Sequence, residues 1–293
     1  MIRLSTPVDC CVAGFQLTFD DRIMILGSCF ADNIGERMRS AGFDVCVNPF
    51  GTLYNPASIA AAIERLDSAE PFREEECVEM GAGAGKICSY MHHTSFARDT
   101  REEFLDNANS VLKESSAFWK SCSKLIVTLG TAYVWTVNGR VVSNCLKRPS
   151  SEFGRRMMGV DECTALIRSF EHAGKDILLT VSPIRHLSDG AHSNTLSKST
   201  LHLAASASGF SYFPAYEILQ DELRDYRYYA EDLVHPSKTA VDIIWERFMN
   251  AIIPVAEHSR IAENEKASRA ALHREILKKA SKPSYRTSGQ TEP

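Results

Sequence analysis

The sequence predicts an α/β protein: one three-layer α/β/α sandwich with a mainly parallel sheet, hairpin excursions and a helical C-terminal extension. Two observations carry this prediction. Short apolar runs recur along the chain, and each is followed by a segment whose apolar residues repeat at helical spacing. Strands that alternate with helices form a parallel sheet covered on both faces. With 293 residues, 44% of them hydrophobic, the chain can also build a sizeable core.

The elements follow in order along the chain. The strands of the main sheet are expected at Ile23–Leu26, Val45–Val47, Leu125–Leu129, Ile177–Val181 and Phe210–Phe213. Residues 77–91 enclose a glycine-rich turn, and residues 133–144 contain Asn138-Gly139, the dipeptide that type I′ turns prefer. Both stretches are therefore predicted to form hairpins outside the main sheet.

The character of the sequence changes after Pro254, where a charged, helix-like segment begins and a polar tail follows. Polar segments of this kind bury little apolar surface and tend to stay disordered. We expect one domain over residues 1–256 and a charged helical extension over residues 257–293, with a disordered tail from about Ser281.

Composition excludes several classes of function. The formal net charge is -4 and the basic residues are spread along the chain, so no nucleic-acid partner is expected. No stretch approaches the roughly 20 apolar residues of a membrane span, and the first residues lack the apolar core of a signal peptide, so a cytoplasmic protein is expected. Nine cysteines in irregular spacing, without a C-x-x-C pair, indicate neither a disulfide framework nor a zinc site. We expect no metal and no organic cofactor, and the sequence leaves the oligomeric state open.

The first candidate site is the triplet Gly27-Ser28-Cys29, directly after the first apolar run. Ligands of open parallel sheets bind at the carboxyl ends of the strands, and a helix N-terminus favours a thiolate. We therefore expect Cys29 to be a nucleophile with a pKa below its ordinary value, and Ser28 to hydrogen-bond within the turn. The alternative is that Cys29 is a buried thiol and Ser28 only a helix cap.

A nucleophile of this kind needs a base, and the base needs a group that fixes its tautomer. Two Asp-x-x-His spacings offer such a pair, Asp189 with His192 and Asp232 with His235. The second pair stands directly before Pro236, which favours the first turn of a helix, and so lies on a defined loop. The first pair lies in a glycine-containing polar loop, where these residues are common for turn reasons. We therefore expect Asp232 and His235 at the site.

These motifs together resemble those of the GSCFA-domain family, which is related to the SGNH/GDSL hydrolases. The resemblance covers roughly residues 20–255 and is carried by "LGSCFADNIG", "NPFGTLYNP", "TLGTAYVW", "TVSPIRHLSDG" and "YAEDLVHPS". It implies the three-layer fold, with Cys29 in the place of the nucleophile, His235 as the base and Asp232 as the group that orients the base.

The resemblance also implies an oxyanion hole. Its glycine block falls on Gly51, whose backbone N–H would be one donor. The block that normally supplies an asparagine meets Gly130-Thr131-Ala132-Tyr133, so that asparagine is missing. Removal of such a donor costs roughly 2.7 to 4 kcal/mol, so a working enzyme needs a substitute. By residue type the candidates are Asn144, Asn48 and Thr131.

Two further polar residues follow the strand that ends near Ser182. Arg185 is able to bind a carboxylate or a phosphate with two hydrogen bonds, and it is equally suited to bridging loop carbonyls. His186 is a candidate either for substrate contact or for a role in the loop itself.

The expected activity is acyl hydrolysis or acyl transfer on an ester, thioester or amide, with a small-molecule, glycan or peptide acyl substrate. Two alternatives remain open at this point. One is a ligand-binding module without turnover, which the missing asparagine favours. The other is a redox-responsive thiol protein, which requires a partner for Cys29 such as Cys145.

Overall fold

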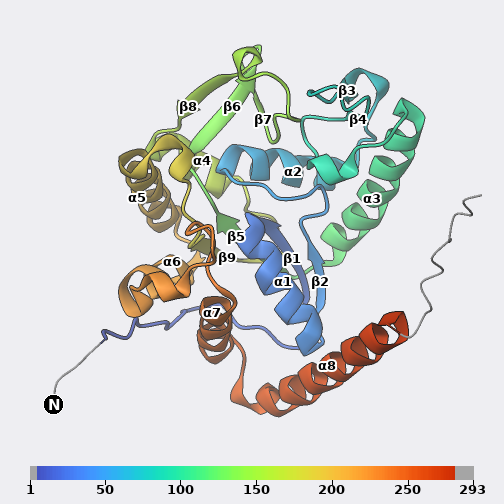
Figure 1. The fold of residues 1–293 in the computed structure, drawn as a ribbon. Coiled ribbons are helices and arrows are strands. Elements are labelled where there is room, and N and C mark those ends of the chain that lie inside the picture. Colours follow the sequence, from blue (N-terminus) through green and yellow to red (C-terminus); the bar gives the residue numbers. More distant parts are fainter. Residues whose placement is uncertain (1–4, 281–293) are drawn as a thin grey trace, which may run out of the picture.

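The computed structural model describes residues 5–280, and its centre is a five-stranded parallel sheet (Figure 1). The strand order is β10-β9-β5-β1-β2. The strands are β1 (Arg22–Gly27), β2 (Asp44–Val47), β5 (Lys124–Leu129), β9 (Asp176–Val181) and β10 (Ser211–Tyr212). The predicted α/β class and its parallel sheet are confirmed. The tail expected from Ser281 lies outside the described residues.

Helices cover both faces of this sheet and complete the three layers. One face carries α2 (Pro56–Ser68), α3 (Arg101–Ser121), α4 (Val160–Arg168) and α5 (Ala191–Ser208). The other carries α1 (Cys29–Ala41), the short α6 (Ala215–Glu217) and α7 (Lys238–Ile252).

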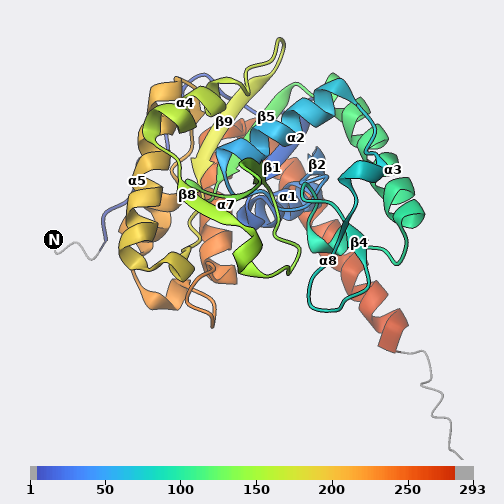
Figure 2. The same cartoon turned by 90° about the horizontal axis from the view of Figure 1, so that it is seen from above.

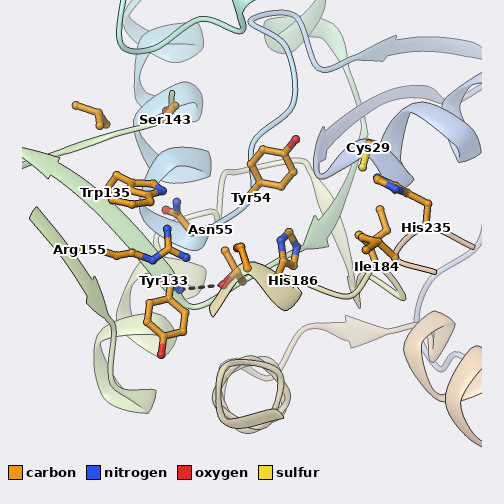
Figure 3. Close-up of a pocket in the computed structure, with 14 residues that line it drawn as sticks. Cys29, Tyr54, Asn55, Tyr133, Trp135, Ser143, Arg155, Ile184, His186 and His235 are labelled. Carbon is orange, nitrogen blue, oxygen red and sulfur yellow. Dashed lines mark hydrogen bonds between the residues drawn. The ribbon is translucent and has the colours of Figure 1, made fainter. Parts of the chain in front are cut away.

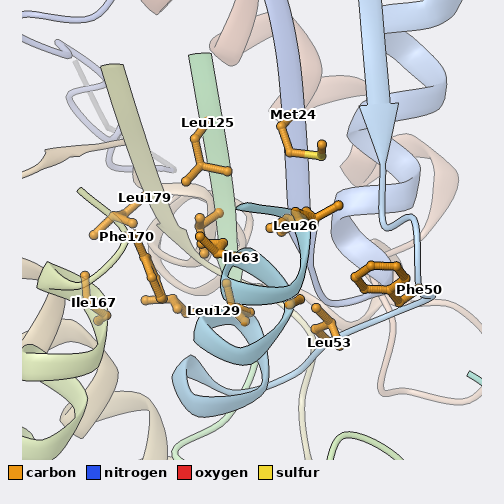
Figure 4. Close-up of a cluster of buried hydrophobic side chains, with 14 of the residues drawn as sticks. Met24, Leu26, Phe50, Leu53, Ile63, Leu125, Leu129, Ile167, Phe170 and Leu179 are labelled. Atoms are coloured by element: carbon orange, nitrogen blue, oxygen red, sulfur yellow. The ribbon is translucent and has the colours of Figure 1, made fainter. Parts of the chain in front are cut away.

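The apolar runs are continuous because each central strand is buried on both faces. In β1, Met24 and Leu26 pack under the first group of helices, while Ile23 and Ile25 pack under the second, and all four side chains are fully buried. Figure 4 shows the first of these clusters between the sheet and α2. A strand with this pattern is typical of a parallel sheet.

Two small sheets lie outside the main one. Strands β3 (Val78–Glu79) and β4 (Ile87–Cys88) pair antiparallel, and β6 (Tyr133–Val137) pairs with both β7 (Arg140–Val142) and β8 (Gly154–Met157). Figure 1 places the β6 sheet at one end of the molecule, and Figure 2, viewed from that end, shows it beside α2.

The predicted turn at Asn138-Gly139 is present, because both residues have positive φ, 50° and 77°. The sequence predicts only a hairpin here. The third strand, β8, is an addition that the short and polar segment 154–157 did not signal.

The C-terminal helix α8 (His258–Ala280) packs against the domain through its first half. Ile261 is buried, the Asn264 side chain donates to the Ala41 carbonyl at 2.8 Å, and the Trp245 ring N–H donates to Glu265 at 3.1 Å. The division of the chain at residue 256 stays a prediction. Within residues 5–280, none of the helices combines the length and the apolar composition that a bilayer span requires.

Candidate functional site

The turn between β1 and α1 places Ser28 and Cys29 in different surroundings. Ser28 is the N-cap of α1 and is fully buried. Its hydroxyl accepts from the Phe30 N–H at 3.2 Å, donates to the Ser182 hydroxyl at 2.9 Å and lies 3.2 Å from the Thr128 hydroxyl. Cys29, the first helical residue, is half-buried and lines a cavity. The buried hydroxyl therefore shapes the turn, as expected, and the thiol faces the cavity.

Gly27 fixes this turn because no other residue fits there. Its φ is +140°, and a Cβ atom would lie 2.2 Å from the Thr128 carbonyl oxygen. The Gly27 N–H donates to the Asn48 side-chain oxygen at 2.8 Å, and the Asn48 amide donates to Asp32 at 2.8 Å. Asn48 thus braces the start of α1 from behind.

His235 and Asp232 form a preorganised pair on the loop before α7. The His235 Nδ1 lies 2.6 Å from the Asp232 carboxylate, which also accepts the backbone N–H groups of Val234 and His235 at 2.9 Å each. The pKa of Asp232 is lowered to about 2. The largest cause is the hydrogen bond from the His235 N–H, followed by that from the Val234 N–H and that from the His235 ring. The carboxylate stays ionised, and with Nδ1 engaged the free ring nitrogen is Nε2.

The same loop is tied to the segment after β9 by Arg185. The Arg185 guanidinium donates to the Leu233 carbonyl at 3.1 Å and lies 5.4 Å from the centre of the Tyr229 ring, and its backbone N–H donates to the Val234 carbonyl at 3.1 Å. Of the two roles predicted for Arg185, these contacts favour the bridging of loop carbonyls.

Cys29 and His235 lie at one end of a cavity of about 280 Å³, where Figure 3 shows the ring turned toward the sulfur. No side chain of the described residues hydrogen-bonds the sulfur in this arrangement. The other walls are Tyr54, Asn55, Thr131, Tyr133, Trp135, Val142, Ser143, Arg155, Ile184, His186, Ser188 and Val234. Cys29 and His235 are far apart in the sequence, and the fold brings them together at this cavity.

The remaining predicted residues separate into two groups. Thr131 and His186 line the cavity, although the Thr131 hydroxyl is already 3.0 Å from the Ser197 hydroxyl. Asn48, Gly51, Asn144 and Arg185 are not among the residues that line it. The Gly51 N–H donates to the Asn48 carbonyl at 2.7 Å, and the Asn144 side chain accepts from the Leu146 N–H at 2.9 Å. His192, from the disfavoured Asp-x-x-His pair, is also absent from the cavity walls.

His186 presents an unpaired nitrogen in this cavity. Its Nε2 is buried and has no hydrogen-bond partner among the described residues, and its ring meets the Tyr54 ring edge-on at 5.7 Å. Burial first, and then the positive charge of Lys198, lower the pKa of His186 to about 3. The ring is therefore neutral at physiological pH.

The expected low pKa of Cys29 is wrong. Burial first, and the nearby Asp32 carboxylate second, raise the pKa of the thiol to about 11. The N–H groups of Cys29 and Phe30 at the helix start and the Lys198 ammonium act in the opposite direction but are weaker. Desolvation and a like charge outweigh the helix N-terminus, so the resting side chain is a neutral thiol.

Lys198 is a residue that the sequence analysis missed. It is almost completely buried in α5, and its ammonium donates to the carbonyls of Gly130 and Ser182 at 2.7 and 2.8 Å. Burial lowers its pKa to about 7. Lys198 therefore ties the ends of β5 and β9 together beneath the turn that carries Cys29. Lys198 could have been recognised in the sequence as a lysine among the apolar positions of a predicted helix.

Asn55 and Arg155 were also missed. Asn55 caps α2, where its side-chain oxygen accepts from the Ser58 N–H at 2.9 Å, so its amide nitrogen is the atom free for a ligand. The Asn-Pro pair at the helix start could have marked it. Arg155 lies over the rings of Trp135 and Tyr133, at 4.2 and 5.0 Å, and pairs with Asp189. Arg155 stands on β8, a strand that the sequence did not predict.

Within the described part of the chain, no group of three or more His, Cys, Asp or Glu side chains is arranged to hold a metal ion. Comparison with curated proteins and with solved structures found no match. A sequence model of the GSCFA family matches residues 22–248. This match spans well over half of the sequence and includes Cys29, Asp232 and His235, so the chain belongs to the GSCFA family.

Proposed function

We propose that the protein is an acyl hydrolase or acyltransferase that acts on an ester, thioester or amide. One observation carries the proposal: the His235 ring, held at 2.6 Å by the Asp232 carboxylate, shares a cavity with the Cys29 thiol. A nucleophile, a base and a group that orients the base are the parts this chemistry needs. The relationship to SGNH/GDSL hydrolases, the cytoplasmic location and a small-molecule, glycan or peptide substrate are part of the proposal.

The reaction would proceed in two steps. His235 Nε2 takes the proton of the Cys29 thiol as sulfur bonds to the substrate's carbonyl carbon, and the carbonyl electron pair moves to oxygen. Collapse of this intermediate re-forms the carbonyl and expels the alcohol, thiol or amine, which takes the proton from His235. Water or an acceptor alcohol then attacks the thioester, His235 accepts its proton and returns it to the Cys29 sulfur. Asp232 stabilises the imidazolium formed in each step.

The raised pKa of the thiol defines the role of His235. A thiol with a pKa of about 11 is protonated at neutral pH, so attack requires removal of its proton during the reaction. Cys29 would therefore depend on general base catalysis by His235 and not on a standing thiolate–imidazolium pair.

The donor for the oxyanion comes from the helix start in this proposal. The backbone N–H of Cys29 lies close enough to the sulfur to lower its pKa and is the donor that this proposal uses, whereas the N–H of Phe30 donates to the Ser28 hydroxyl at 3.2 Å. The N–H of Gly51, the donor implied by the resemblance, is engaged by Asn48, and the N–H groups of Gly130 and Thr131 donate to the Tyr54 carbonyl at 2.9 and 2.8 Å. Asn55, whose amide nitrogen is free, would contact the substrate beside the Cys29 N–H.

The ligand-binding alternative is favoured by the same raised pKa, because an inert thiol suits a site without turnover. The redox alternative has less support. All nine cysteines are free thiols in the structure, and Cys145 is not part of the cavity that Cys29 lines.

The proposal is tested by acyl transfer from a panel of p-nitrophenyl esters and acyl thioesters. We expect turnover that falls by several orders of magnitude in Cys29→Ala, as loss of a triad nucleophile does. His235→Gln should lose a similar factor, and an acylated Cys29 should appear in the mass spectrum of wild type when the reaction is quenched. Equal rates for wild type and Cys29→Ala would reject the proposal and leave the binding module.

Ser28→Ala is the matched control for the neighbouring hydroxyl. It removes three buried hydrogen-bond contacts, so we expect it to lower the free energy of unfolding by about 1 to 3 kcal/mol. Turnover per folded molecule should be affected far less than in Cys29→Ala. Loss of turnover in Ser28→Ala, with full turnover in Cys29→Ala, would assign the chemistry to the serine.

A further inference from the structure

A second and larger cavity, of about 700 Å³, adjoins the site. It lies between α2, the β3–β4 pair and the β6–β7 hairpin. Its walls are Ala57, Ser58, Ala61, Glu75, Glu76, Val78, Ser89, Tyr90, Met91, Val137, Asn138, Arg140, Val141, Val142 and Ser143. None of these residues belongs to the proposed catalytic group.

The two cavities share Val142 and Ser143, and their other walls come partly from the same elements. Side chains alternate along a strand, so Tyr133, Trp135 and Val137 lie on one face of β6. Tyr133 and Trp135 line the cavity of Cys29, and Val137 lines the larger cavity. Val142, which pairs with Trp135 across the hairpin, and the adjacent Ser143 line both.

The opposite wall is α2 in both cases. Asn55 at its start lines the cavity of Cys29, and Ala57 and Ala61 line the larger one. The two cavities meet at Val142 and Ser143, and together we call them the groove, which extends from the thiol, between α2 and the face of β6 and β7, toward β3.

The groove changes character along its length. Near Cys29 its walls carry ring and polar groups. In the larger part, seven of the fifteen lining residues are alanine, valine or methionine, and the surface is more apolar than polar although Glu75, Glu76 and Arg140 also line it. Of the acidic residues at its far end, Glu76 is paired with Arg65 at 2.5 Å. A cavity whose surface is largely apolar accepts a flexible apolar chain.

We propose that this groove binds an unbranched saturated acyl chain whose carbonyl group lies at Cys29. The inference rests on the proposed function for the position of the carbonyl, and it adds the substrate class. In this proposal, α2 and the β6–β7 hairpin select the length of the acyl chain.

Binding of fatty-acid anions tests the proposal without turnover. The full chain carrying Cys29→Ala is titrated with butanoate, hexanoate, octanoate and decanoate by calorimetry, below the concentrations at which they form micelles. We expect the affinity to rise by up to about fourfold for each added methylene that is buried. The rise should stop when the groove is full. Equal affinities along the series, or no binding, would overturn the proposal.

A blocking variant with a matched control locates the binding. Ala61 lines the groove and is partly exposed, so Ala61→Phe in the Cys29→Ala background fills the groove from the α2 side without crowding the core. Decanoate affinity should then fall at least tenfold while butanoate affinity changes little. Glu64→Phe, on the same helix at an exposed position outside the groove, should leave the series unchanged. An unaltered series in Ala61→Phe would place the chain elsewhere and reject the groove.

A second variant covers the case in which Ala61→Phe does not fold. Val141 lines the groove and is 37% exposed, so Val141→Asp adds a charge to the wall at a position that tolerates a polar side chain. It should weaken decanoate binding in the same way.

The outcomes also separate the two proposals. If binding depends on chain length but turnover does not depend on Cys29, the groove proposal stands and the enzyme proposal is rejected. If turnover depends on Cys29 but binding does not depend on chain length, the enzyme proposal stands and the groove proposal is rejected.

Discussion

Cys29 ionises less readily in the folded protein than a free cysteine does. Half-burial and the Asp32 carboxylate raise its pKa to about 11, while the ordinary value is about 8.5. Asp32 stands three residues along the same helix, so its charge is within reach of the sulfur. Burial, with Asp32 in the first turn of α1, therefore outweighs the helix N-terminus and keeps the Cys29 thiol protonated.

The pH dependence of alkylation measures this effect. Because the thiolate is the reactive form, the rate of Cys29 modification by iodoacetamide should rise about tenfold per pH unit from pH 7 to 10 without a plateau. The rate is measured on the peptide that contains Cys29 by mass spectrometry. A free cysteine peptide should level off above about pH 8.5 under the same conditions. A plateau below pH 8 on the Cys29 peptide would show an activated thiol instead.

A separate variant identifies the charge responsible. Asp32→Asn removes the carboxylate next to Cys29, so it should lower the thiol pKa and speed alkylation at pH 8. The rise in pKa that remains is the effect of burial, the largest cause, reduced by the N–H groups at the helix start and by Lys198.

At the scale of elements, the loop that carries His235 depends on contacts from outside itself. Within the loop, Asp232 binds two backbone N–H groups, and Leu233 adopts a positive φ of 56°. From outside, Arg185 binds the Leu233 and Val234 carbonyls. The base of the proposed triad is therefore positioned by the segment that follows β9.

Replacement of Arg185 should loosen this loop. Contacts of partly exposed charged side chains contribute little to stability, so Arg185→Gln should change the free energy of unfolding by less than about 1 kcal/mol. Hydrogen exchange over residues 230–237 should nevertheless become faster, because the guanidinium bond to Leu233 is lost. Arg224→Gln, at a side chain that is 80% exposed, is the control and should leave exchange unchanged. Equal exchange in both variants would contradict the positioning role.

At the scale of the whole molecule, buried neutral histidines make stability depend on pH. His92 is fully buried among the rings of Phe50, Phe72, Phe96 and Phe104, with its Nδ1 2.7 Å from the Ser89 hydroxyl. Burial lowers its pKa to about 3, against about 6.5 in an unfolded chain. The unfolded state binds the proton first, so the contribution of His92 is complete above pH 6.5 and is lost as the pH falls toward 3.

His92→Phe should therefore flatten the acid side of the stability profile. One such group accounts for a loss of about 2 kcal/mol between pH 6.5 and 5, at about 1.4 kcal/mol per pH unit. Urea unfolding at both pH values, for wild type and variant, measures it. The histidines His186 and His202, whose pKa values burial also lowers, should keep part of the slope in the variant. Parallel profiles for the two proteins would show that His92 does not titrate as described.

The features that the sequence predicted are those encoded locally. Strand β1 is an apolar run because both of its faces are covered, and Asp232 reaches His235 because three residues of a turn separate them. Asn55 and Lys198 reach the site only through packing of α2 and α5 against the sheet, which spacing along the chain does not reveal. The thiol pKa was misjudged because the helix N-terminus is visible in a sequence, whereas the depth of burial is not.

Ser28 and Cys29 have separate roles at the turn between β1 and α1. The turn is held by the Gly27 backbone and the buried Ser28 hydroxyl, while the Cys29 side chain hydrogen-bonds no other side chain of the described residues. The side chain at position 29 can therefore be exchanged without loss of the hydrogen bonds that hold the turn. Exchange of sulfur for oxygen in Cys29→Ser should therefore change the reactivity of this position and leave the turn intact.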